Sequence, residues 1–104
     1  MNLAIISGTL GPITEGNVFK RNDGVTVVDG HLKKCYFVNG SLKETRFFYT
    51  ISGNRADEFL DNYHEGDKVV MSGKMISRED SDGRYWFTIG CTSVAKLDPS
   101  EGDL

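Results

Sequence analysis

Residues 45–75, which read TRFFYTISGNRADEFLDNYHEGDKVVMSGKM, form the stretch that decides the fold. The aromatic and β-branched residues 45–52 are typical of a strand, and residues 69–75 are typical of another. Between them, Asn54 is placed to cap a helix of about ten residues, which Gly66 stops. The apolar residues of this helix fall on one face and are Ala56, Phe59, Leu60 and Tyr63. The sequence therefore predicts one helix between two strands.

The rest of the chain alternates short β-like runs with turn signals. The expected strands cover residues 3–10, 13–19, 25–28, 32–38, 45–52, 69–75 and 84–97. The expected turns are Gly11-Pro12, Asn22-Asp23-Gly24, Asp29-Gly30, a longer loop over 39–44, and Ser81-Asp82-Gly83. An all-β chain of five main strands, with its one short helix between strands three and four, has the order of the OB-fold barrel. We therefore expect a five-stranded OB-fold barrel.

The length of 104 residues suits one small domain. We expect residues 1–97 to form that domain and residues 98–104 to form a short acidic tail, which begins at Asp98-Pro99. The chain has no apolar run near the roughly 18 residues of a membrane span, and its start lacks the basic region of a secretory signal. The expected location is the cytoplasm.

The formal charge of −3 is unevenly distributed. Residues 1–56 are net basic, whereas residues 57–97 and the last seven residues are each net acidic. A net acidic chain is unlike the strongly basic domains that bind duplex DNA. Binding to single strands remains open, because base stacking supplies part of that affinity.

The motifs of the common enzyme and metal-site classes are missing from the sequence. Cys35 and Cys91 are too far apart for a zinc or thioredoxin-type motif, and we expect two buried thiols and no disulfide. His31 and His64 lack neighbouring ligands at metal-binding spacing. The sequence also has no P-loop, nucleophile elbow or dinucleotide fingerprint. We therefore expect no enzyme activity, no metal and no cofactor.

Four segments carry a family resemblance. They are residues 1–10 (MNLAIISGTL, ending in Gly-x-Leu), 51–56 (ISGNRA), 63–75 (YHEGDKVVMSGKM) and 82–85 (DGRY). They resemble the corresponding segments of the bacterial and phage single-stranded DNA-binding protein family. The third segment is the most specific, because it is similar to the family pattern Tyr-Leu-x-Lys-Gly-Asp-x-Val-x-Val-x-Gly-x-Leu. The resemblance covers residues 1–10 and 44–97, and it implies an OB-fold that works as a tetramer or dimer on single-stranded DNA.

The alternation of side chains along a strand decides which of them point outward. In residues 45–52 the expected inward set is Phe47, Tyr49 and Ile51, and the outward set is Arg46, Phe48, Thr50 and Ser52. In the last strand the expected inward set is Tyr85, Phe87 and Ile89, and the outward set is Trp86 and Thr88. Outward aromatic rings stack on unpaired bases, and each stacked base contributes about 1–3 kcal/mol. Phe48 and Trp86 are therefore the first stacking candidates.

Tyr36 is the third stacking candidate, because it shares a face with Lys34, whereas Lys33 shares the other face with Cys35. The candidate phosphate contacts are Arg46, Lys34, Lys33, Arg55, Lys20, Arg21, Lys74 and Arg78. Structural alternatives stay open for each of these residues. Phe48 could pack in the barrel or a subunit interface, Trp86 could close a core edge, and a surface cation is often only solvated.

The first functional hypothesis is a protein that coats single-stranded DNA with little sequence preference during replication, recombination or repair in a bacterium, phage or mobile element. The second is a replication-restart accessory resembling primosomal replication protein N, which works through other replication proteins. The third is an OB module that recognises protein or sugar. The acidic second half favours the third hypothesis, as does the lack of the tryptophan that the family usually carries in strand three. The short acidic tail is either a reduced recruitment tip or a frayed terminus.

Overall fold

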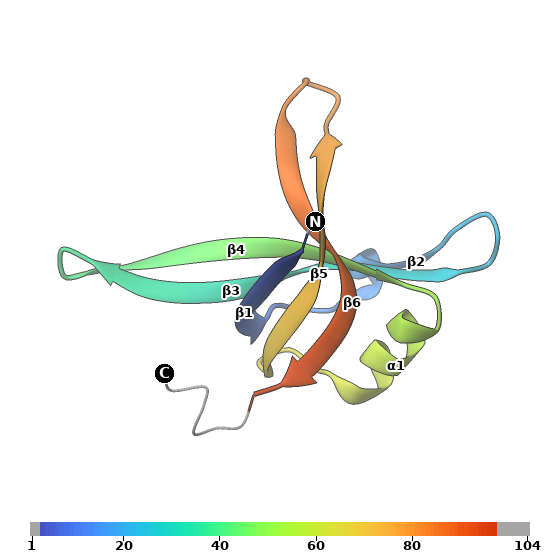
Figure 1. The fold of residues 1–104 in the computed structure, drawn as a ribbon, viewed down its shortest axis with the longest axis horizontal. Coiled ribbons are helices and arrows are strands. Elements are labelled where there is room, and N and C mark those ends of the chain that lie inside the picture. The colour runs from blue at the N-terminus through green and yellow to red at the C-terminus, as the bar shows by residue number, and fades with distance from the viewer. Residues whose placement is uncertain (1–2, 98–104) are drawn as a thin grey trace.

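The computed structural model describes residues 3–97 and shows six strands, one α-helix and one 3-10 turn (Figure 1). The strands are β1 (Ala4–Leu10), β2 (Val18–Lys20), β3 (Thr26–Val38), β4 (Ser41–Ser52), β5 (Lys68–Glu79) and β6 (Tyr85–Lys96). The helix is α1 (Asn54–Asn62), and the 3-10 turn is η1 (Glu15–Asn17). The sheet order is β1-β5-β6-β4-β3-β2, and an additional pairing of β1 with β3 closes it. Five strands thus form a closed barrel, and β2 is a short addition to β3, which confirms the predicted OB-fold barrel.

Helix α1 lies between β4 and β5, the strands predicted to flank it. The expected third and fourth strands carry the labels β4 and β5 here, because the short strand β2 also takes a number. The N-cap of α1 is Gly53, so the prediction that Asn54 caps the helix is wrong. Gly53 has a φ of 74°, a conformation that glycine adopts without steric cost, and this lets the chain turn sharply out of β4.

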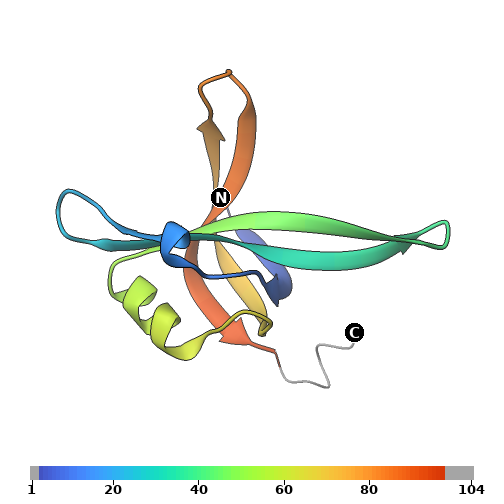
Figure 2. The same cartoon turned by 180° about the vertical axis from the view of Figure 1, so that it is seen from behind.

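The core lies between the inner sides of the strands and helix α1. Phe59 of α1 packs edge-on against Tyr49, with ring centroids 5.6 Å apart, and stacks on Tyr63 at 5.2 Å. Figures 1 and 2 show α1 beside the barrel, on the same side as the β2–β3 turn. The buried core residues are Leu10, Val28, Leu32, Tyr49, Ile51, Ala56, Phe59, Val69, Met71, Ile89 and Cys91. The helical face predicted from the sequence therefore packs on this core.

Two hairpins extend beyond the barrel in different directions (Figure 1). We call residues 34–45 the β3–β4 arm and residues 76–87 the β5–β6 arm. The expected loop over 39–44 is wrong, because β3 and β4 stay paired up to Val38 and Ser41. Asn39 and Gly40 alone form the turn, with φ values of 50° and 80°. An Asn-Gly pair favours such a two-residue hairpin, which lets the strands continue to the tip.

The predicted turn at Asp29-Gly30 is also wrong, because β3 runs through both residues without interruption. Gly30 serves close packing there. A Cβ atom at this position would collide with the Tyr49 hydroxyl of the neighbouring strand. The strand expected over residues 13–19 is replaced by η1 and the short β2, so that part of the prediction is wrong as well.

No helix within residues 3–97 combines the length and the apolar character that crossing a membrane requires. The acidic tail predicted for residues 98–104 lies outside the described residues.

Candidate nucleic-acid interface

Strand register divides the side chains of the barrel into two sides, because directly paired residues point to the same side of a sheet. Phe48 of β4 pairs with His31 of β3 and Thr88 of β6, and Trp86 of β6 pairs with Arg78 of β5. These residues lie opposite the core side that holds Tyr49. We call this side of β3–β6 the outer face, and its members used below are Asp29, His31, Lys33, Arg46, Phe48, Lys74, Ile76, Arg78, Trp86 and Thr88.

Phe48 and Trp86 lie on the outer face with 45% and 37% of their surfaces exposed. The side-chain alternation thus places both rings outside the core, as predicted. Both rings line the same two surface hollows. We call the first the polar hollow because charged side chains line it; it has a volume of about 270 Å³ and is also lined by Asp29, His31, Tyr49, Arg78 and Thr88. The apolar hollow has a volume of about 350 Å³ and is also lined by Arg46, Phe47, Met75 and Phe87.

The apolar hollow lies where β4 and β6 separate. Their parallel pairing covers Phe48–Thr50 and Thr88–Gly90, and the two arms diverge beyond Phe48 and Thr88 (Figure 1). The structure therefore brings the two predicted stacking residues together at the junction of the arms.

Four cationic side chains share the outer face with these rings. Arg46 pairs with Lys33 across β3 and β4, two residues from Phe48 along β4. Lys74 and Arg78 belong to β5 on the far side of β6. The Glu44 carboxylate lies 3.8 Å from Arg46 Nη2, but both side chains are well exposed, so this ion pair holds Arg46 only weakly. The outer face thus combines exposed rings with flanking positive charge.

Two predicted residues of the β3–β4 arm, Lys34 and Tyr36, lie on its other side. They pair with Thr45 and Lys43, and Lys34 and Tyr36 line a small hollow together with Thr45 and Phe47. Lys34 Nζ also lies 3.5 Å from Ser7 Oγ of β1. The structure separates this pair from Phe48 and Trp86.

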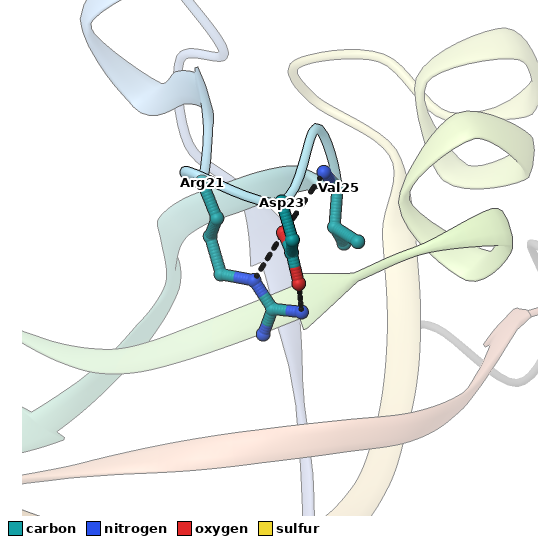
Figure 3. Close-up of polar contacts among 3 residues, drawn as sticks. All are labelled: Arg21, Asp23 and Val25. Atoms are coloured by element: carbon teal, nitrogen blue, oxygen red, sulfur yellow. Dashed lines mark hydrogen bonds and ion pairs between the residues drawn. The ribbon is translucent and has the colours of Figure 1, made fainter.

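The remaining predicted cations lie away from the two rings. Arg55 belongs to α1 and lines a hollow between the helix and β6. Lys20 ends β2. Arg21 is already paired, since its Nε and Nη2 lie 3.3 and 2.9 Å from the two carboxylate oxygens of Asp23 (Figure 3). Because Arg21 donates these bonds, the pKa of the Asp23 carboxyl is lowered. The structure does not group these cations with the stacking residues.

The inward prediction for β4 is correct at Tyr49 and Ile51 and wrong at Phe47, which is 36% exposed next to the β3–β4 arm and lines the apolar hollow. The inward prediction for the last strand is correct at Ile89 and wrong at Tyr85 and Phe87, which are 69% and 62% exposed. Both belong to the β5–β6 arm, which extends beyond the barrel, so their side of the strand has no core to pack against. Thr88 shows the reverse, since it lies on the outer face but is buried. It pairs with Phe48 on one side and Ile76 on the other, and these larger side chains flank it.

Sequence reasoning missed two polar residues of the outer face, Asp29 and His31. Asp29 Oδ1 and His31 Nε2 are buried and have no hydrogen-bond partner within the described residues. The His31 ring packs against Gly11, where a Cβ atom would collide with it. Burial lowers the pKa of His31, and Arg46 and Lys33 lower it further, so the imidazole is neutral at pH 7. The sequence contains a pattern that could have identified these two residues, because polar residues at 29, 31 and 33 alternate with Val28, Gly30 and Leu32.

Cys35 is exposed on the β3–β4 arm, on the same side of β3 as Lys33, so the prediction that it is buried is wrong. Cys91 is buried in the core, and burial raises the pKa of its thiol. Within residues 3–97, no three His, Cys, Asp or Glu side chains come together as ligands for a metal ion. The exposed rings of Phe48 and Trp86 and the flanking cations are the main features of the outer face.

Comparison of the sequence with protein-family models and with curated proteins finds no match. Solved structures do match. The SSB domain of a protein from Synechococcus sp. is similar to this chain with a TM-score of 0.67 and 20% sequence identity, over 90% of this chain and 93% of that chain. The two chains share one fold. At this identity the likeness establishes the barrel topology, and it confirms the family resemblance of the sequence at the level of the fold.

Proposed function

We propose that this protein binds single-stranded DNA across the outer face, with bases stacked on Phe48 and Trp86. The observation that carries the proposal is the placement of these two exposed rings side by side among Lys33, Arg46 and Arg78. Unpaired bases offer a π-face to such rings, and cations follow the phosphates of the strand. The same observation supports single strands over a duplex, whose bases are already stacked on one another.

The fold comparison supports this proposal. The abbreviation SSB ordinarily stands for single-stranded DNA-binding, and the SSB domain from Synechococcus sp. has the same barrel. Stacking and phosphate contacts depend little on base identity, so most of the affinity should be sequence-tolerant. Such binding suits the coating of single strands that replication, recombination or repair exposes in the cytoplasm.

We propose further that the protein acts as a homo-oligomer, a dimer or a tetramer. One small barrel covers a short strand of about 4–16 nucleotides, and joining several barrels raises the avidity for a long strand. Large apolar side chains are exposed away from the rings, including Phe37 at 74% and Leu42 at 63% on the β3–β4 arm and Ile5 at 67% on β1. Apolar groups exposed in this way favour contact with another chain. Light scattering of the pure protein should give a mass above 11.5 kDa, and a monomer would contradict this part of the proposal.

The exposed apolar arm also favours a second candidate function, a module that mainly contacts other proteins, as a replication-restart accessory would. The two functions respond differently to the double substitution of Arg46 and Phe48 by Ala. This change should abolish binding to single strands if the first function holds. A protein-contact function that uses Phe37 and Leu42 should survive it.

Fluorescence polarisation of a labelled dT oligomer tests the proposed function. We expect saturable binding that weakens as salt rises, because phosphate binding releases counterions. A duplex of the same length serves as the matched control and should bind much more weakly. Absence of binding to the single strand at low salt would overturn the proposal.

A further inference from the structure

The polar hollow of the outer face contains the carboxylate of Asp29. Neither the phosphate contacts nor the base stacking of the proposed function uses this group. Its Oδ1 atom is buried and has no hydrogen-bond partner within the described residues. Asn17 lies close but donates to the backbone carbonyl of Asp29, at 2.9 Å, and not to the carboxylate. A buried acceptor without a donor is unfavourable, and a ligand that supplies a donor would remove this cost.

The Asp29 carboxylate is negatively charged, so a phosphate is excluded as its partner, because two anions repel each other. A carboxylate only accepts hydrogen bonds, so its ligand must present N–H or O–H groups. The hollow is walled by the rings of Phe48 and Trp86, and at about 270 Å³ it lies just below the range of drug-sized sites. A flat ring that carries N–H donors on its edge meets both conditions. One base of the bound strand is such a ring, and in this respect the inference rests on the proposed function.

Arg78 narrows the choice of base. It lines the same hollow and pairs with Trp86 across β5 and β6. A guanidinium only donates hydrogen bonds, and it matches the O6 and N7 acceptors of guanine with two bonds. The hollow thus offers an acceptor at Asp29 and a donor fork at Arg78. It is also lined by Tyr49 and His31, whose Oη and Nε2 atoms are buried without a hydrogen-bond partner within the described residues.

Guanine is the base that satisfies both groups at once. Its N1–H and its N2 amino group lie side by side and suit a carboxylate, while O6 and N7 accept from an arginine. Thymine presents a single N–H between two carbonyl oxygens, which a carboxylate repels. Cytosine and adenine place a ring acceptor beside their amino group, and that acceptor also faces the carboxylate unfavourably. We infer that the polar hollow is a guanine-selective pocket, within an interface that otherwise tolerates any base.

Oligomers that differ only in their bases test this inference on the unmodified protein. Three labelled oligomers of one length are compared by polarisation: dT alone, dT with single guanines spaced along it, and the same strand with inosine at each guanine. Inosine lacks only the N2 amino group of guanine. We expect the guanine strand to bind about fivefold to tenfold more tightly than dT, and inosine to lose most of this gain.

Asp29→Asn should remove the difference between the guanine and inosine strands, because an amide presents one acceptor in place of two. Asp61→Asn, an equal charge change at an exposed position of α1, is the matched control and should keep the difference. Far-UV circular dichroism checks that each variant is folded. If Asp29→Asn does not fold, the comparison of guanine with inosine on the unmodified protein decides alone.

The outcomes separate this inference from the function on which it rests. Equal affinity for all three strands would overturn the guanine pocket and leave single-strand binding intact. A guanine preference that survives both inosine and Asp29→Asn would also overturn it, because the preference would then arise elsewhere. Failure of every strand to bind would overturn both proposals.

Discussion

Replacement of Phe48 by Ala, compared with the same replacement at Tyr36, locates the binding surface. The two rings are almost equally accessible, at 45% and 46% exposed, but they lie on opposite sides of the sheet. Full burial of a Phe side chain contributes about 1.5–3 kcal/mol, so truncation of either half-exposed ring should lower the free energy of unfolding by about 1 kcal/mol. A general loss of stability would therefore affect both variants alike.

Binding should separate the two variants. A base stacked on Phe48 contributes about 1–3 kcal/mol, so the Kd of Phe48→Ala for a dT oligomer should rise about 5-fold to 150-fold. Tyr36→Ala lies off the outer face and should change the Kd by no more than about twofold. Polarisation titrations at one fixed salt concentration measure both values, with thermal melting as the check on folding. An equal loss in both variants, or a larger loss in Tyr36→Ala, would refute the placement of the interface on the outer face.

Three further predictions concern charge, packing and pH. Arg46→Gln removes one phosphate contact, so the slope of log K against log salt concentration should become shallower by about 0.7, and an unchanged slope in salt titrations would exclude Arg46 from phosphate binding. Gly30→Ala forces a methyl group against the Tyr49 hydroxyl, and denaturant titration should show a loss of about 1–3 kcal/mol; an unchanged midpoint would contradict the close packing described for Gly30. Burial and the neighbouring Arg46 and Lys33 hold the pKa of His31 below its usual value, so the unfolded chain takes up the proton more readily. The stability that neutral His31 contributes should be complete above about pH 6.5 and decline below it, and His31→Gln should melt with a flatter dependence on pH; identical pH profiles would contradict this.

The sequence predicted the features of the fold that local chemistry controls. The apolar face of α1 and the β propensity of the flanking strands gave the element order, and that order indicated the barrel. Alternation along β4 placed Tyr49 and Ile51 inside and Phe48 outside, as the structure shows, but it also placed Phe47 inside, where the structure leaves it 36% exposed. The correct inferences hold because each depends on a periodicity that a few neighbouring residues express.

The errors arose where long-range packing decides the role of a residue. Gly30 looked like a turn residue, but it is glycine because the Tyr49 ring of the next strand passes over it. Alternation cannot show where a strand leaves the barrel, so Tyr85 and Phe87 were expected inside although no core extends to their arm. Tyr36 is separated from Phe48 by the register of β3 against β4, which alternation within one strand does not reveal. Asp29 was overlooked because the supposed turn removed it from the strand whose outer side it occupies.

The measurement that most directly tests the central claim is the fluorescence of Trp86 during titration with dT oligomers at low and high salt. Trp86 is the only tryptophan of the chain, and it is 37% exposed on the outer face beside Phe48, so its emission reports on this surface alone. A base stacked on the indole should quench the emission until it reaches a plateau. At high salt the binding is weaker, so more oligomer should be needed to reach that plateau. Unchanged emission under conditions in which polarisation shows the oligomer to be bound would place the strand away from Trp86 and contradict the proposed interface.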